Sequence, residues 1–207
     1  MRPSSRPVRV GIIANPLAGK DVRRLVARAA TVSVAALVQN VRLLLCGLDA
    51  AGVDEALIMP DPYQVGQSAA DGAGARRMRI TLLPFAATGT PRDTVNAASE
   101  MIRRGAGVIV TFGGDGTNRL VARVLIDAKS DDDECSATAL LPLAHGTNNV
   151  FPWRIDPAVA GWAAGIWAQH RLRNCLQRVK VWELWRNGKK VDIALVDIVR
   201  TRHLWRG

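Results

Sequence analysis

Short apolar runs alternate with helix-length segments along most of this chain, and this alternation constrains the fold more than any other feature. The clearest runs are VRVGIIA at residues 8–14 and GVIVTF at residues 107–112. Runs of this length that contain several β-branched residues are typical of buried strands. Because strands that alternate with helices form a parallel sheet wound on both faces, the sequence predicts an α/β fold with a doubly wound, mostly parallel sheet.

The remaining elements follow from periodicity and from helix-start signals. We expect further strands at residues 56–59, 79–85 and 137–143, and helices at residues 21–30, 34–51, 64–76, 91–104, 118–128 and 156–169. The helix after Thr90 has the clearest start, because Thr90 suits the N-cap, Pro91 suits the first helical position and Asp93 lies three residues after the cap. The helix at 34–51 places one apolar face toward a core, formed by Leu37, Val41, Leu44, Leu45 and Leu48.

The pattern changes in the last third of the chain, where all six tryptophans follow position 150. Apolar runs on either side of Asn187-Gly188 predict a β-hairpin with a tight turn. We therefore expect an α/β nucleotide-phosphate-binding domain at 1–152, a connecting helix region at 153–175 and the incomplete beginning of an antiparallel domain at 176–207. Two strands cannot bury both of their faces, so we expect a fragment, a truncated product, or a sheet completed through a partner.

Four polar loops that contain glycine follow expected strands, at residues 15–20, 88–90, 113–117 and 146–149. In an open parallel sheet, ligands bind beyond the carboxyl ends of the strands. We therefore expect these loops to meet at one edge of the sheet and to form a binding site there.

The loop Gly113-Gly114-Asp115-Gly116-Thr117 carries the strongest signal. Its glycines leave backbone N–H groups uncovered before a helix, which suits phosphate binding. A carboxylate at Asp115 would repel phosphate unless it holds Mg²⁺ or takes a proton from an attacking hydroxyl. The alternative is that Asp115 serves only as a turn residue or helix N-cap.

The other loops are less specific. The hydroxyl and two amides of Thr147, Asn148 and Asn149 suit a base, ribose or phosphate, although they also suit a simple turn. Asn15 precedes a proline and is therefore either a turn residue or part of the site. Lys20 is either a phosphate ligand or a solvated lysine.

Two common nucleotide motifs are absent. A Walker A sequence fails because Ala14 replaces its first glycine and Asp21 follows Gly19-Lys20. The dinucleotide fingerprint fails because Arg119 stands at its last glycine. These departures argue against a P-loop NTPase and against a Rossmann dehydrogenase.

Composition excludes several other classes. The net charge is +10, but the basic residues are dispersed and no nucleic-acid-binding motif is present, so we expect a solvated basic surface and no nucleic-acid partner. The cysteines and histidines lack metal-ligand spacing, so we expect neither a disulfide framework nor a tightly bound metal. No uncharged apolar run reaches about 18 residues, so we expect a cytoplasmic protein without stable membrane insertion.

Three motifs together carry a family resemblance: Asn-Pro-x-x-Gly-Lys-Asp, Gly-Gly-Asp-Gly-Thr and Gly-Thr-Asn-Asn. In combination they resemble the superfamily of NAD kinases, diacylglycerol kinases and sphingosine kinases. The segments GIIANPLAGKDVRRLVARA, TFGGDGTNRLVA and LPLAHGTNNVFP most resemble its ATP-NAD kinase-like members of the acetoin catabolism protein X group. The resemblance covers residues 8–199 and implies an α/β domain, a β-sandwich domain, and an active site between them.

The resemblance implies a kinase that uses ATP and Mg²⁺, with Asp115 as the general base and NAD as the leading acceptor. Together with the loops above, it gives the expected nucleotide- and phosphate-binding residues: Asn15, Gly19, Lys20, Thr88, Gly89, Thr90, Gly113, Gly114, Gly116, Thr117, Asn118, Thr147, Asn148 and Asn149. Asp197 is the expected acceptor-binding residue, although Val196 stands where NAD kinases carry asparagine. Alternative readings are a lipid or sphingoid-base kinase and a non-catalytic nucleotide-binding module.

Residues 179–185 place large apolar groups on both faces of one expected strand, because successive side chains alternate. The isolated hairpin would then expose a sheet edge and an apolar patch. We therefore expect a homo-oligomer that pairs through this hairpin.

Overall fold

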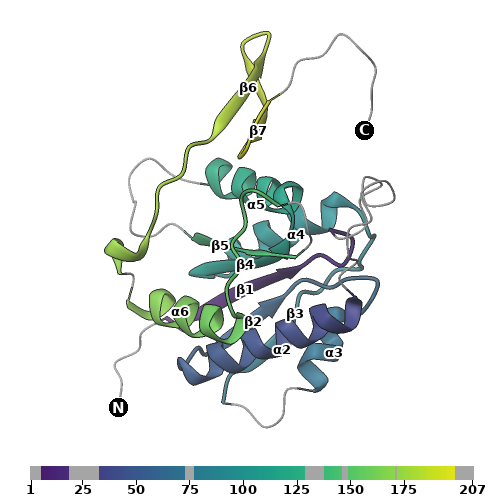
Figure 1. Ribbon diagram of the computed structural model, residues 1–207, viewed down its shortest axis with the longest axis vertical. Coiled ribbons are helices and arrows are strands. Elements are labelled where there is room, and N and C mark those ends of the chain that lie inside the picture. Colours follow the sequence, from purple (N-terminus) through teal and green to yellow (C-terminus); the bar gives the residue numbers. More distant parts are fainter. Residues whose placement is uncertain are drawn as a thin grey trace.

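The computed structural model describes residues 6–18, 33–72, 77–128, 138–145, 149–170 and 172–198. A five-stranded sheet with the order β3-β2-β1-β4-β5 lies at the centre, and all of its strand pairs are parallel (Figure 1). Its strands are β1 (Arg9–Ala14), β2 (Glu55–Ile58), β3 (Arg79–Leu82), β4 (Val108–Gly113) and β5 (Ala139–Ala144).

Helices cover both faces of this sheet. On one face, α2 (Val34–Ala50), α3 (Val65–Asp71) and α6 (Pro157–His170) share a core with inward-facing residues of β1, β2 and β4. On the other face, α4 (Pro91–Arg103) and α5 (Asp115–Asp127) pack on a second core (Figure 1). The predicted doubly wound parallel sheet is therefore confirmed, and so is the predicted buried stripe of α2, whose five members are fully buried.

The contact between α2 and α6 is unusually close. A Cβ atom at Gly47 of α2 would overlap the backbone carbonyl of Ala158, and one at Gly161 of α6 would overlap the backbone carbonyl of Leu44. Glycine at these positions therefore lets the two backbones approach, which fixes α6 against the sheet-covering helix.

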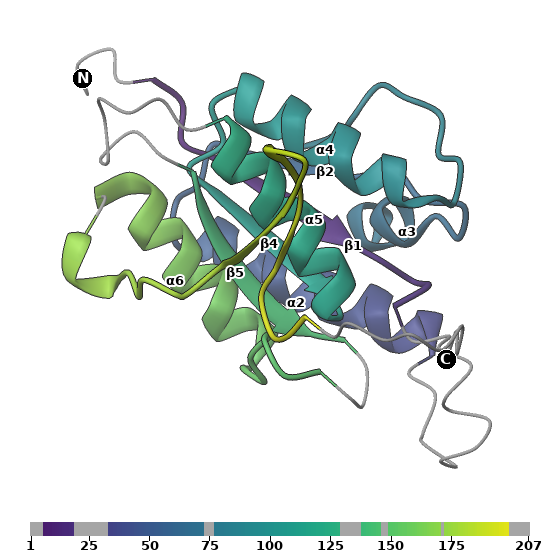
Figure 2. The same cartoon turned by 90° about the horizontal axis from the view of Figure 1, so that it is seen from above.

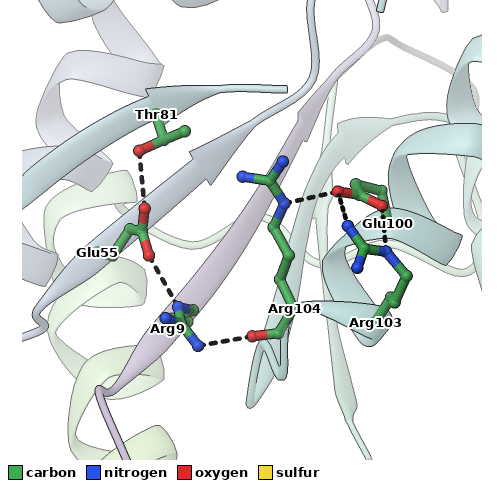
Figure 3. A network of polar contacts seen from close by, with 6 residues as sticks. All are labelled: Arg9, Glu55, Thr81, Glu100, Arg103 and Arg104. Carbon is green, nitrogen blue, oxygen red and sulfur yellow. Dashed lines mark hydrogen bonds and ion pairs between the residues drawn. The ribbon is translucent and has the colours of Figure 1, made fainter. Parts of the chain in front are cut away.

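A polar network ties the amino ends of β1 and β2 to Thr81 of β3 and to the end of α4 (Figure 3). The Glu55 carboxylate accepts hydrogen bonds from Arg9 Nε at 2.8 Å and from Thr81 Oγ1 at 2.8 Å. Arg9 Nη1 also donates to the backbone carbonyl of Arg104 at 2.8 Å, just beyond the end of α4. At that helix end, Glu100 forms ion pairs with Arg103 and Arg104, each at 2.6 Å. The network lies at the amino edge of the sheet, away from the predicted site.

Several element boundaries differ from the prediction. The strand expected at 79–85 ends at Leu82, and the helix expected at 64–76 ends at Asp71, just before Gly72. The helix expected at 118–128 begins earlier, at Asp115, because Gly114 has extended backbone angles and its carbonyl accepts the first helical hydrogen bond from Asn118 N at 3.1 Å. The helix expected at 21–30 lies outside the described residues.

The predicted hairpin is present as β6 (Trp182–Arg186) and β7 (Lys189–Ala194), an antiparallel pair separate from the main sheet. Asn187 and Gly188 have φ values of 52° and 72°, as expected for a tight turn with two left-handed residues. The second strand, β7, ends at Ala194. Seen from above, the hairpin extends over α5 (Figure 2).

Candidate functional site

The site lies where the sheet order reverses. The chain runs outward from β1 to β2 and β3, and then returns to β4 on the other side of β1. Such a switch point is where open α/β sheets bind ligands, because the loops after the two central strands diverge there. Asn15 follows β1 and Gly114 follows β4, so two of the predicted loops meet at this point.

The side chain of Asn15 joins these two loops. Its Nδ2 donates to Thr117 Oγ1 at 2.9 Å, and its Oδ1 accepts a hydrogen bond from Leu17 N at 2.9 Å. Its backbone N donates to the carbonyl of Phe112 at 2.9 Å. Asn15 therefore shapes its own turn and also fixes the start of α5.

Close packing explains two glycines of the Gly113–Thr117 loop. A Cβ atom at Gly113 would lie 2.6 Å from Thr117 Cβ, and one at Gly114 would lie 2.9 Å from Asn149 Oδ1. A Cβ atom at Gly116 would meet nothing within 4 Å, so this backbone faces open space. The first N–H groups of a helix lack intrahelical acceptors, and here they belong to a segment that lines a cavity.

Asn118 supports this loop from behind. It is fully buried, its Oδ1 accepts from Thr111 Oγ1 at 2.5 Å, and its Nδ2 donates to the Gly114 carbonyl at 2.9 Å. Its side chain therefore holds the loop to β4 and does not line the cavity, which differs from its predicted place among the ligand-contacting groups.

The Asp115 carboxylate bridges the loops after β4 and β5. It accepts hydrogen bonds from Phe151 N at 2.9 Å and from Val150 N at 3.2 Å. These contacts hold the carboxylate in one orientation at the first helical position of α5. Asn149, the preceding residue in the same segment, also lines the cavity, and its Nδ2 is buried without a hydrogen-bond partner among the described residues.

The loop at 88–90 is organised by a residue that the sequence indicated only as a helix-start signal. Asp93 is buried, and its carboxylate accepts from Thr88 N at 2.9 Å, Thr88 Oγ1 at 2.8 Å and Gly89 N at 2.8 Å. Gly89 adopts a φ of 71°, which favours glycine. Asp93 thus determines the shape of this wall of the cavity.

These loops enclose a cavity of about 480 Å³. Its walls bring together eight of the predicted site residues: Asn15, Gly89, Thr90, Gly114, Asp115, Gly116, Thr117 and Asn149. Thr88, Gly113 and Asn118 lie behind the walls and support them through the contacts given above. Gly19, Lys20, Thr147 and Asn148 lie outside the described residues.

Asp197 is exposed and does not line the cavity. Sequence reasoning also missed cavity residues, above all Arg119, which it treated only as a break in the dinucleotide fingerprint. Arg119 carries no local signal for a binding role, because its contact with Asp192 comes from a distant segment. The bonds of Asp93 are local, but its place three residues after Thr90 indicates only a helix start.

Two features of the cavity wall suit a phosphate group. Among the described residues the buried Asn149 amide has no hydrogen-bond partner, and such a donor is costly unless a ligand accepts its hydrogen bond. The N-terminus of α5 adds a favourable dipole for phosphate. In the described part of the chain, no group of three or more His, Cys, Asp or Glu side chains is placed to hold a metal by itself. In the same part, no helix combines the length and apolar character needed to cross a membrane.

The chain is similar to known proteins over most of its length. Residues 75–181 match the family model described as the diacylglycerol kinase catalytic domain, a range that contains three of the four predicted loops. Acetoin catabolism protein X of Cupriavidus necator is 34% identical over 202 residues, which cover 92% of this chain and 54% of that protein. The chain therefore spans about half the length of the curated relative it matches.

Proposed function

Because the chain belongs to the family of the diacylglycerol kinase catalytic domain, we propose that it is a kinase that transfers the γ-phosphoryl group of ATP to a hydroxyl of a nucleotide-like acceptor. The observation that carries this proposal is the cavity at the switch point of the sheet, with Asp115 in its wall beside the glycine-rich start of α5. NAD is the leading acceptor, on the resemblance of the three loop motifs to ATP-NAD kinase-like proteins.

Each wall of the cavity has a part in the proposed reaction. The ATP phosphates lie against the N-terminus of α5 and accept a hydrogen bond from the Asn149 amide, which has no partner among the described residues. The Asp115 carboxylate takes the proton of the acceptor hydroxyl. The oxygen of that hydroxyl then bonds to the γ-phosphorus as the bond from the γ-phosphorus to ADP breaks and ADP leaves. The backbone N–H groups of Val150 and Phe151 hold this carboxylate in place. Its oxygens have further lone pairs, and one of these can accept the proton.

The cavity also fits Mg²⁺ that arrives with ATP. Mg²⁺ is usually held by one or two carboxylates together with substrate phosphates, and Asp93 and Asp115 both line the cavity. When bound, the ion would neutralise charge on the transferred phosphoryl group. Asp93 and the phosphates of ATP would hold the ion, because Asp115 is the residue that takes the proton in the proposed reaction.

A lipid hydroxyl is a second candidate acceptor. The indoles of Trp153 and Trp162 are 56% and 53% exposed, which suits contact with a lipid surface. The matched family model also names a lipid kinase domain. Assays with NAD and with diacylglycerol in mixed micelles, each with ATP and Mg²⁺, separate the two acceptors.

The substitution Asp115→Asn tests the proposal, because asparagine keeps the size and one oxygen acceptor but cannot take a proton. We expect a folded protein with unchanged circular dichroism, ATP binding within a few-fold of wild type, and turnover lower by roughly 10²–10⁴-fold. Asp71→Asn on the exposed end of α3 is the matched control and should keep wild-type turnover.

Two outcomes would contradict the kinase assignment. Full turnover by folded Asp115→Asn protein would remove Asp115 from the chemistry. Tight ATP binding by the wild type without product from any acceptor would favour a non-catalytic nucleotide-binding module.

A further inference from the structure

One face of α5 carries a charged residue at every fourth position. Asp115, Arg119, Arg123 and Asp127 share this face because residues four apart are neighbours on a helix. The stripe begins in the cavity wall with Asp115, and α5, the helix that carries it, runs beneath the hairpin (Figure 2). It therefore connects the proposed phosphate site with β7.

The hairpin contacts this stripe through complementary charges. Asp192 of β7 accepts hydrogen bonds on one oxygen from Arg119 Nη1 and, at 3.4 Å, from Arg123 Nη1. Lys190, on the same face of β7, pairs with Asp127 at 2.9 Å. The separate two-stranded sheet is thus joined to the helix that begins at the cavity.

Arg119 both lines the cavity and contacts the hairpin. It lines the cavity, and among the described lining residues it is the one with a cationic side chain. It lies about one helical turn after Asp115. A guanidinium has five N–H donors in a planar fork, so the hydrogen bond to Asp192 leaves donors for a second anion.

We propose that Arg119 binds the phosphates of the nucleotide and that Asp192 positions its guanidinium, so that the hairpin contributes a positioning residue to the cavity. This inference rests on the proposed kinase function and deepens it. Holding one edge of a long, flexible side chain reduces the freedom it loses when the ligand binds. Arg123 donates to the same Asp192 oxygen as Arg119. Two guanidinium groups thus share one carboxylate, and the positive charge that remains attracts phosphate.

Calorimetric titration of the 207-residue chain with ATP and with adenosine tests the proposal. Arg119→Ala should weaken ATP binding roughly tenfold and leave adenosine binding unchanged, because adenosine lacks phosphates. Arg119→Lys should recover only part of the loss, since lysine has no planar fork. Asp192→Asn should weaken ATP binding about threefold, and the double variant should bind no more weakly than Arg119→Ala alone.

The control is Asp127→Asn, which removes the Lys190–Asp127 ion pair between α5 and the hairpin without touching the contact of Arg119 with Asp192, and it should leave both affinities unchanged. The side chains of Arg119 and Asp192 are 33% and 36% exposed, so both substitutions should leave a folded chain.

Four results would overturn the inference. Unchanged ATP binding by Asp192→Asn would show that Asp192 does not position Arg119 for the ligand. Tighter ATP binding would show that Asp192 competes with phosphate for Arg119. An equal loss of ATP and adenosine binding in Arg119→Ala would show a merely structural role. A wild-type chain that binds adenosine but gains no affinity from the phosphates would overturn both this inference and the proposed function.

Discussion

Asn118 shows how much of the cavity depends on residues that never face it. Its amide is fully buried and makes one hydrogen bond to the β4 side chain Thr111 and one to the Gly114 carbonyl. Water cannot replace these partners in the core, so each lost bond leaves a buried polar group unpaired.

The substitution Asn118→Leu should therefore destabilise the protein by about 2–4 kcal/mol and weaken ATP binding, because the Thr111 hydroxyl and the Gly114 carbonyl lose their partner. Urea denaturation gives the first quantity and calorimetry the second. Asn96→Leu is the matched control, since Asn96 is an exposed asparagine of α4, and it should change stability by no more than about 0.5 kcal/mol. An equal effect of the two substitutions would contradict the supporting role of Asn118.

The sequence predicts residues of the cavity best where a local motif follows a strand. Gly114, Asp115 and Asn149 belong to polar loops with glycine, and the topology of a parallel sheet brings such loops together. Arg119 and Asp93 could not be found in this way. The contact of Arg119 depends on Asp192, which lies 73 residues later in the chain, and the bonds of Asp93 depend on the fold of its own loop.

Among the secondary-structure elements, β1 and β2 carry opposite charges at their amino ends, where Arg9 pairs with Glu55 (Figure 3). Burial alone would raise the pKa of Glu55, but hydrogen bonds from Arg9 and Thr81 and the nearby positive charges lower it below its ordinary value of 4.5. At the end of α4, hydrogen bonds from Arg103 and Arg104 lower the pKa of Glu100 from 4.5 to about 2. Both carboxylates thus keep their charge to lower pH in the folded protein than in the unfolded chain.

A lowered folded-state pKa means that the stabilisation is complete above pH 4.5, the ordinary value, and is lost as the pH falls below it. Glu55→Gln should lower the free energy of unfolding by about 1–2 kcal/mol at neutral pH and make its fall in acid shallower. Urea denaturation at several pH values measures both. Arg9→Met removes the main partner of Glu55 and should also make the fall shallower. An unchanged acid slope in both variants would contradict the role of this pair.

Element types were more predictable than element ends. Apolar periodicity indicates α2 because its buried stripe faces one core, and the Thr90-Pro91 signal indicates α4. The start of α5 was predicted three residues late, because a run rich in glycine is typical of a loop. Here the extended Gly114 backbone and the buried Asn118 amide allow the helix to begin at Asp115.

For the whole molecule, the distribution of apolar surface is uneven. The two cores of the α/β part are well covered, whereas every residue of β6 is exposed. Trp182 and Trp185 are 60% and 57% exposed, and Leu184 between them is 42% exposed. Both strands of a two-stranded sheet are edge strands, so backbone donors and acceptors are also open to pairing.

We expect the 207-residue chain to self-associate through this hairpin, because burying one tryptophan removes on the order of 200 Å² from water. Light scattering over a range of protein concentrations should show a mass that rises with concentration. Replacing both Trp182 and Trp185 by threonine keeps a residue that favours strands and should shift the chain toward monomer. Trp162→Gln on α6 removes an equally exposed indole away from the hairpin and should leave the association unchanged. A wild-type chain that stays monomeric at every concentration and binds no hydrophobic dye would show that its exposed apolar surface does not drive association.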